Sequence, residues 1–138
     1  MRILVVDDDS ATAMSMIRYL QEVGDCDLAQ DGDDAIKAFR GSFREAYPFD
    51  LICLDILMPK IDGHQTLARI RQIEREEGVQ IGEGVKVLMV SACDDEDSIL
   101  RSFMKLCDGY LTKPVKKKQL LEKLREIELF GPHRRIGR

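Results

Sequence analysis

Short apolar runs along this chain alternate with longer stretches in which apolar residues recur at helical spacing. The central run, residues 51–54, is apolar without alternation, which is typical of a strand covered on both faces in a parallel sheet. Four further runs predict strands, and the run at 26–30 is the weakest of them. The five predicted strands are residues 3–6, 26–30, 51–54, 85–90 and 110–112.

Helical periodicity appears in each stretch that follows a predicted strand. The first predicted helix starts at an N-cap, Asp9 or Ser10, and Gly24 closes it. The third predicted helix follows Gly63, is rich in charge and has a thin apolar stripe. The predicted inner faces are Ala13, Met16, Ile17 and Leu20; Ala35, Ile36 and Phe39; Leu67, Ile70 and either Ile73 or Glu74; Ile99, Leu100, Phe103 and Cys107; and Leu120, Leu121, Leu124 and Ile127.

The alternation of strand and helix, repeated five times, predicts an α/β fold with a five-stranded, doubly wound parallel sheet. This is a flavodoxin-like, three-layer sandwich. Right-handed crossovers leave few ways to wind such a sheet. The order 2-1-3-4-5 places the topological switch, where ligands bind in these sheets, between the first and third strands.

Length and charge are consistent with one domain and a short appendage. The chain has 138 residues, 44% of them hydrophobic, and a net charge of −4. Residues 114–138 carry eight Lys and Arg against three Glu, which leaves the preceding part at −9. We therefore expect a domain over residues 1–130 and a short basic tail over 131–138.

Two classes of protein are disfavoured by composition. No apolar run approaches the roughly 20 residues of a membrane span, and residues 3–6 are too few for the core of a signal peptide, so a cytoplasmic location is expected. The four cysteines, Cys26, Cys53, Cys93 and Cys107, form no C-x-x-C pair, and only two histidines are present. A zinc site is thus improbable, and reduced thiols in the core are expected.

Carboxylates follow the two strands that flank the topological switch. The first strand runs into Asp7 and Asp8, and the third runs into Asp55, ahead of Pro59 and Gly63. Asp55 alone is better explained as the start of a turn. Three converging carboxylates, however, repel one another and require a cation. Mg²⁺, which prefers oxygen ligands and retains several waters, is the best candidate.

Four motifs in this order resemble the receiver domain of two-component response regulators, as in single-domain chemotaxis regulators. They are V-V-D-D, L-D-I-L-M-P-K-I-D-G, V-S-A and G-Y-L-T-K-P, and the resemblance covers roughly residues 1–130. It implies that the peptide bond between Lys113 and Pro114 is cis. It also implies these roles: Asp55 as phosphoacceptor, Asp7 and Asp8 as metal carboxylates, Leu57 as a metal ligand through its backbone carbonyl, Ser91 as the hydroxyl that closes on the phosphoryl group, Lys113 as its paired cation, and Tyr110 as a rotamer switch.

The resemblance implies a phosphorylation-switched signalling module in a phosphorelay. The donor would be a phosphohistidine on a sensor histidine kinase or phosphotransfer protein, and Mg²⁺ with Lys113 would neutralise the transferred charge. The module would not be an enzyme in the usual sense, although it would promote its own phosphorylation and dephosphorylation. Output is expected through protein contact, with activation promoting a homodimer. The implied partner face surrounds Ser98, Arg101, Tyr110 and Lys117.

Two alternative functions, and a role in nucleic-acid binding, fit the sequence less well than this interpretation. A phosphatase with an aspartate nucleophile would have a second acid two residues after Asp55, where this chain has Leu57. A degenerate receiver that only binds partners would not need the complete set of site residues. The basic residues of 116–118 and of the tail predict at most weak, non-specific, salt-sensitive DNA binding.

Several nearby residues are expected to have structural roles. Asp9 is interpreted as a helix cap, Asp62 as a turn residue and His64 as an exposed helix residue. Ser91 could instead cap the next helix, although Asp94 is better placed. Tyr110 could instead be an edge-strand aromatic half packed on the last helix.

Leu57 and Cys93 are expected to orient an attacking water poorly, which predicts slow self-dephosphorylation.

Overall fold

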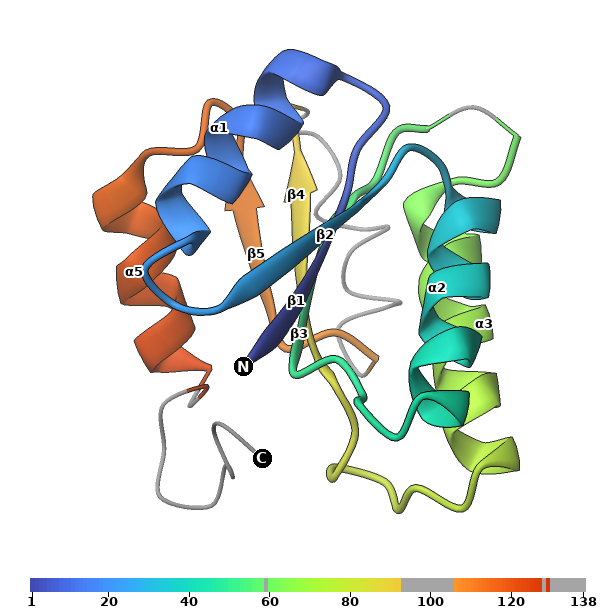
Figure 1. The fold of residues 1–138 in the computed structure, drawn as a ribbon. Helices are drawn as coiled ribbons and strands as arrows, with labels where there is room; N and C mark the ends of the chain where they lie inside the picture. Colours follow the sequence, from blue (N-terminus) through green and yellow to red (C-terminus); the bar gives the residue numbers. More distant parts are fainter. Residues whose placement is uncertain (59, 93–105, 128, 130–138) are drawn as a thin grey trace.

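A five-stranded parallel sheet forms the centre of the computed structural model, which describes residues 1–58, 60–92, 106–127 and 129 (Figure 1). The strand order is β2-β1-β3-β4-β5, as the sequence predicted. Observed and predicted strands agree to within one residue at each end, and Asp55 and Ser91 prove to be the last residues of their strands. The strands are β1 (Arg2–Val6), β2 (Asp25–Ala29), β3 (Leu51–Asp55), β4 (Lys86–Ser91) and β5 (Gly109–Thr112).

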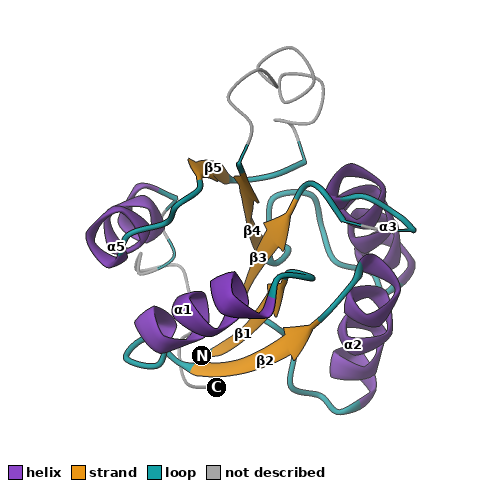
Figure 2. Cartoon of the chain, turned by 90° about the horizontal axis from the view of Figure 1, so that it is seen from above, coloured by secondary structure: helices purple, strands orange, loops and turns teal. Residues whose placement is uncertain are grey.

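Helices cover both faces of the sheet, which confirms the three-layer sandwich. Figures 1 and 2 show α1 (Ser10–Leu20) and α5 (Lys117–Glu126) on one face, and α2 (Gly32–Arg44) and α3 (Gly63–Glu76) on the other. Most of the helix predicted around Ile99 to Cys107 lies outside the described residues. Cys107 itself is half-buried and precedes β5 outside any helix, so its prediction as a helical residue was wrong. Among the helices described, none has the length and apolar character needed to cross a bilayer.

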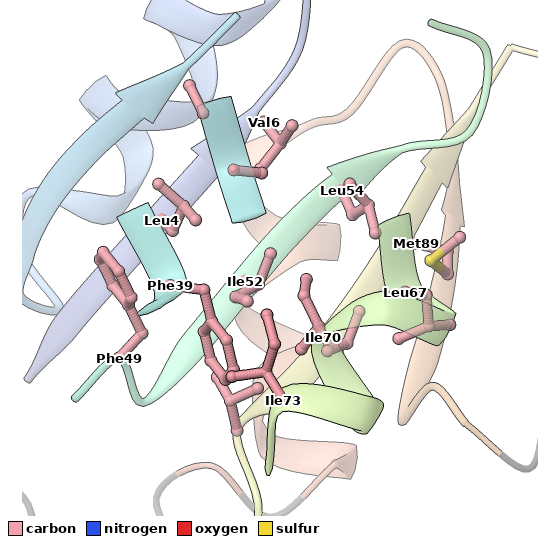
Figure 3. Packing of buried hydrophobic residues seen from close by; sticks show 14 of the residues in the cluster. Leu4, Val6, Phe39, Phe49, Ile52, Leu54, Leu67, Ile70, Ile73 and Met89 are labelled. Atoms are coloured by element: carbon pink, nitrogen blue, oxygen red, sulfur yellow. The ribbon is translucent and has the colours of Figure 1, made fainter. Parts of the chain in front are cut away.

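The core is divided between the two faces because successive residues of a strand point to opposite sides. In β1, Leu4 and Val6 join the cluster beneath α2 and α3, whereas Ile3 and Val5 join the cluster beneath α1 and α5. Figure 3 shows the first cluster, in which Phe39 of α2 lies close to side chains of α3 and β3. Burial of β1, β3 and β4 on both faces explains their continuous apolar runs.

The cysteines only partly follow the expectation of core positions. Cys53 is fully buried in β3, but Cys26 and Cys107 are half-buried, and Cys93 lies outside the described residues. Cys26 belongs to β2, an edge strand in which only Ala29 is fully buried. The three described thiols are free. Burial raises the pKa of the Cys26 thiol to about 11 and raises that of Cys107 as well, so neither is an activated nucleophile.

The inner face of α3 is wider than its apolar stripe indicated. Both Ile73 and Glu74 are buried, and the carboxylate of Glu74 accepts hydrogen bonds from Arg71 Nη1 and from the Val85 N–H, each at 2.7 Å. The Arg71 Nε also donates to the Leu106 carbonyl at 2.8 Å. Glu74 is thus a compensated buried charge that joins α3 to the start of β4, far from the carboxyl ends of the strands.

Candidate functional site

Three carboxylates meet at the carboxyl ends of β1 and β3, the two strands that flank the topological switch. Oxygen atoms of Asp7, Asp8 and Asp55 lie within 4.8 Å of one another. Asp7 and Asp55 are each 4% exposed, whereas Asp8 is exposed. The adjacent pairing of β1 and β3 is what places them together, because Val6 is opposite Leu54 and each acid comes one residue later. The predicted convergence is confirmed.

Lys113 supplies the positive charge that this cluster requires. Its Nζ lies 3.0 Å from Asp7 Oδ2 and 3.5 Å from Asp55 Oδ2. It follows β5 directly, and its backbone N–H donates to the carbonyl of Ser91 at 2.8 Å, which fixes the loop to the end of β4. The bond between Lys113 and Pro114 is cis, as predicted. The ammonium is closer to Asp7 than to Asp55, a preference that the sequence did not indicate.

Burial and like charge perturb the acid at the end of β3. Desolvation, followed by the negative charge of Asp7, raises the pKa of Asp55 to about 6 despite the opposing effect of Lys113. Burial disfavours the charge of Lys113, but the hydrogen bond to Asp7 and the charge of Asp55 outweigh it, so the pKa of the ammonium is raised. The ammonium of Lys113 therefore offsets the effects of burial and of Asp7 at Asp55 only in part.

This donor set fits a hard divalent cation. Three carboxylate oxygens lie close together at the ends of two strands, one of the acids is exposed, and the three acids outnumber the ammonium of Lys113. Mg²⁺ is commonly bound through one or two carboxylates and keeps several waters. The raised pKa of Asp55 is consistent with this, because a bound cation would offset both the burial and the repulsion by Asp7 that raise it.

Two further predicted residues lie on neighbouring strands. Ser91 is fully buried at the end of β4, one residue beyond Val90, which is opposite Asp55. Tyr110 in β5 is opposite Met89 and packs, half-buried, against the cluster beneath α2 and α3. The alternative of an edge-strand aromatic is confirmed in part, because β5 is an edge strand and Tyr110 borders a pocket with Glu122 and Lys123 of α5. The hydrophobic packing of Tyr110 is nevertheless against the opposite cluster, and Leu111 occupies the face toward α5. Ser91 is the last residue of β4, and the alternative that it caps the following helix concerns residues outside those the structure describes.

The loop that follows Asp55 is held against the backbone of the site. The N–H of Leu57 donates to Asp55 Oδ1 at 3.3 Å, and the N–H of Gly63 donates to the carbonyl of Ile56 at 2.8 Å. A Cβ at Gly63 would lie 2.5 Å from the Asp55 carbonyl oxygen, so only glycine permits this approach. The side chain of Leu57 is 57% exposed, at the rim of the site.

The structural residues predicted near the site have mixed outcomes. Asp9 caps α1, as predicted, by accepting hydrogen bonds from the Ala11 N–H at 3.2 Å and Thr12 Oγ1 at 2.7 Å. Asp62 is the N-cap of α3 within a capping box with Gln65, a more specific role than a turn residue. His64 is 9% exposed, so its prediction as an exposed residue was wrong. It lies three residues before Leu67, and that spacing could have revealed its burial.

The predicted partner face is described only in part. Ser98 and Arg101 of the predicted partner face, with Asp94, lie outside the described residues. Lys117 is exposed at the start of α5 and pairs with Glu22 at 2.8 Å. The sequence analysis missed Gly32, whose close contact with the loop after β3 only the tertiary structure reveals.

Comparisons with known proteins identify relatives of the chain. The family model of the response regulator receiver domain matches residues 3–125, a range that contains the acidic cluster and Lys113. The regulatory protein VanRB of Enterococcus faecalis is 30% identical over 142 residues, which are 99% of this chain and 58% of that protein. The chemotaxis protein CheY of Treponema pallidum is 27% identical over 128 residues, 91% of this chain and 81% of that protein.

Relatives of larger size match over a smaller share of their length. The sensor histidine kinase GacS of Pseudomonas protegens is 34% identical over 125 residues, which are 88% of this chain but 12% of that protein. This chain therefore spans only part of the length of GacS and of VanRB.

Solved structures share the fold. A CheY-like receiver domain protein from Methanospirillum hungatei has a TM-score of 0.74 and 26% identity, and the match covers 94% of this chain and 93% of that one. The response regulator protein TrrA from Thermotoga maritima, solved in complex with Mg²⁺ and BeF, has a TM-score of 0.71 and 31% identity, with 91% and 97% covered.

Proposed function

Because this chain belongs to the response regulator receiver domain family, we propose that it accepts a phosphoryl group on Asp55 and uses the modified residue as a signalling switch. The observation that carries this proposal is the pairing of two buried carboxylates, Asp7 and Asp55, with a single ammonium, that of Lys113. Of the three carboxylates, Asp55 has its pKa raised to about 6 by burial and by Asp7. It ends the central strand, at the edge where ligands bind in such sheets.

We propose that Asp7, Asp8 and Asp55 hold Mg²⁺, together with the backbone carbonyl of Leu57. A magnesium ion, when bound, would neutralise the charge that develops on the transferred oxygens. Asp8 is the exposed member of the cluster and so would face the bound water molecules. The Mg²⁺ and BeF present with TrrA support this assignment for the family fold.

The remaining residues would position the reacting groups rather than exchange protons. The N–H of Leu57, which donates to Asp55 Oδ1, orients the carboxylate and leaves its second oxygen facing Lys113. Lys113 would pair with the phosphoryl oxygens, a fixed charge that needs no reorganisation during transfer. Transfer breaks the donor's phosphorus–nitrogen bond and forms a bond from phosphorus to the Asp55 oxygen, so the donor histidine leaves with the electron pair.

We propose that the phosphoryl group then biases Ser91 and Tyr110. Phosphorylation adds negative charge and acceptor oxygens beside Asp55, which the Ser91 hydroxyl would approach. Inward movement of Ser91 would make room for Tyr110, two pairs of residues away across β4 and β5. A local change in charge thus biases a two-state packing arrangement.

The partners that we propose follow the family. The phosphoryl donor would be a histidine kinase or phosphotransfer protein, as GacS among the relatives is a sensor histidine kinase. The output face would surround Tyr110 and Lys117, which are described, and Ser98 and Arg101, which are not. A homodimer formed through this face on activation is part of the same proposal.

The experiment that tests the proposal is labelling by a small acyl phosphate. Purified protein is incubated with acetyl phosphate with and without Mg²⁺, and intact mass and peptide mapping locate the modification. We expect stable, Mg²⁺-dependent addition of one phosphoryl group, on Asp55 alone. Asp55→Asn should abolish labelling, and Lys113→Gln should slow it.

Asp9→Asn is the matched control, since it alters an exposed acid at the same edge but keeps an N-cap for α1. It should label like the wild type. Labelling that persists in Asp55→Asn, or that does not depend on Mg²⁺, would refute the proposal. Rapid multiple turnover of acetyl phosphate would instead indicate a phosphatase.

A further inference from the structure

The first turn of α2 lies directly against the loop that joins β3 to α3. A Cβ atom at Gly32, the first residue of α2, would collide with Thr66 Oγ1 and would lie 2.5 Å from Cγ1 and 2.7 Å from Cδ1 of Ile61. Thr66 has little freedom to withdraw, because it is fully buried and its hydroxyl donates to the Asp62 carbonyl at 2.9 Å. The helix and the loop are therefore in contact with no spare volume at this point.

The opposite end of the same loop belongs to the acidic site. Ile56, the residue after Asp55, donates its N–H to the Val90 carbonyl at 3.0 Å and accepts from the Gly63 N–H at 2.8 Å. Leu57 donates to Asp55 Oδ1 at 3.3 Å. Ile61 lies two residues before Gly63, so a displacement at Ile61 is expected to reach Ile56, and with it Asp55 and Leu57 on either side, through the Gly63–Ile56 hydrogen bond.

Electrostatic contact between helix and loop is present but minor. Lys60 Nζ lies 3.5 Å from Asp31 Oδ2, yet the Lys60 side chain is 66% exposed, and exposed ion pairs contribute little. Asp31 is principally the N-cap of α2, since its Oδ1 accepts from the Asp34 N–H at 2.8 Å. Steric contact at Gly32, rather than the ion pair, determines how close the loop lies to the helix.

We propose that the first turn of α2 fixes the position of the β3–α3 loop by steric contact. Gly32 and Ile61 are then positioning residues for the metal ligands Asp55 and Leu57. This inference rests on the proposed function, because it assigns those two residues to Mg²⁺. Neither Gly32 nor Ile61 contacts the ion. Their effect is to set the position of the loop that supplies Leu57 and adjoins Asp55, as outer residues commonly do at metal sites.

Gly32→Ala is the decisive variant because helix propensity predicts a harmless or stabilising change, whereas the close contact predicts a displaced loop. Helix propensity alone favours alanine over glycine at this position. The close contact predicts instead that the added methyl group pushes Ile61 and Thr66 away and displaces the loop. Gly41→Ala is the matched control in the same helix, because a Cβ there meets only Glu45 Oε1, at 3.9 Å.

The first measurement is Mg²⁺ affinity by calorimetry at pH 7.5 and the dependence of acetyl phosphate labelling on Mg²⁺ concentration. We expect Gly32→Ala to weaken Mg²⁺ binding by about tenfold. The labelling rate at saturating Mg²⁺ should change much less, because the phosphoacceptor and Lys113 remain. Gly41→Ala should bind Mg²⁺ as the wild type does. Ile73→Ala, a core change at the far end of α3, should lower stability without altering Mg²⁺ affinity.

The second measurement needs no metal. Amide chemical shifts of Leu57 and Gly63 in metal-free protein should move in Gly32→Ala and remain in place in Gly41→Ala. Ile61→Ala removes the loop side of the contact without crowding, and should also weaken Mg²⁺ binding if Gly32→Ala fails to fold.

The possible outcomes distinguish a failure of the positioning role of Gly32 and Ile61 from a failure of the proposed function. The positioning role would be overturned if the folded Gly32→Ala and Ile61→Ala variants bound Mg²⁺ with affinities within about twofold of the wild type. Unchanged Leu57 and Gly63 amide shifts in Gly32→Ala or, if that variant does not fold, in Ile61→Ala would also overturn it. A wild-type protein that neither binds Mg²⁺ nor takes a phosphoryl group would overturn the function, and with it the positioning role.

Discussion

Asp55→Asn is expected to stabilise the metal-free protein at neutral pH, although it removes the proposed phosphoacceptor. In the folded protein, burial and the charge of Asp7 raise the pKa of Asp55 from 3.8 to about 6. The ionised carboxylate is thus less favourable in the folded than in the unfolded state. Asparagine has a similar shape and no charge, so the variant avoids this cost.

The magnitude follows from the size of the pKa shift. About two pKa units correspond to about 3 kcal/mol as an upper bound, at roughly 1.4 kcal/mol per unit. Solvent reaches the cluster at the exposed Asp8, and the resulting screening lowers the expected gain to about 1–2 kcal/mol. For a domain of this size, that gain raises the melting temperature by roughly 3–8 °C.

The sign of the pH dependence is fixed by the direction of the shift. A carboxyl group with a raised folded-state pKa stabilises the wild type only while protonated, and this contribution is lost as pH rises from about 4 through 6. The advantage of Asp55→Asn should therefore be complete above pH 6, decline between pH 6 and 4, and disappear below about pH 4, where both states of the wild type are protonated.

Urea unfolding in EDTA, followed by circular dichroism at a series of pH values, measures this difference. Asp9→Asn is the control, because hydrogen bonding to Thr12 lowers the pKa of that exposed cap, and its loss should not stabilise the protein. Added Mg²⁺ should stabilise the wild type more than Asp55→Asn and so narrow the difference. A variant that is no more stable than the wild type at pH 7.5, or whose advantage persists at pH 4, would show that charge repulsion at Asp55 is unimportant.

Two further predictions concern the loop after β3. Leu57→Asn combined with Cys93→Glu should accelerate loss of phosphate from pre-labelled protein by about tenfold, or roughly 1.4 kcal/mol of barrier, because polar side chains can orient the attacking water. Wild-type decay as fast as that of the double variant would contradict this. Gly63→Ala should lower the free energy of unfolding by about 1–3 kcal/mol, because its Cβ would meet the Asp55 carbonyl and the Ile56 Cα, neither of which can yield. Urea unfolding tests it against Gly41→Ala, and equal stabilities of the two variants would count against the close approach.

The sequence predicted the five strands and the acids at their ends, and the family resemblance helped to supply the strand order. Residues 51–54 are apolar at every position, and only a strand buried on both faces requires that pattern. Each acid comes where such a run stops, and parallel strands bring their carboxyl ends to one edge. Asp7, Asp8 and Asp55 could therefore be placed together before any contact was known. The N-cap role of Asp9 was equally predictable, because capping depends on neighbours in sequence.

Only the tertiary structure decided which side chains beyond the apolar stripes are buried and which face they take, because both depend on neighbours that are distant in sequence. His64 and Glu74 are buried on α3, a helix that packs against α2 and contributes to the cluster on the sheet, so its covered arc is wider than an apolar stripe can indicate (Figure 2). Periodicity identifies a face but not the width of the surface that covers it. Tyr110 faces the α2 and α3 layer because of its register with Met89, which depends on strand pairing. Gly32 is required by the contact of the first turn of α2 with Ile61 and Thr66, which are far away in sequence, and no local pattern encodes such a contact.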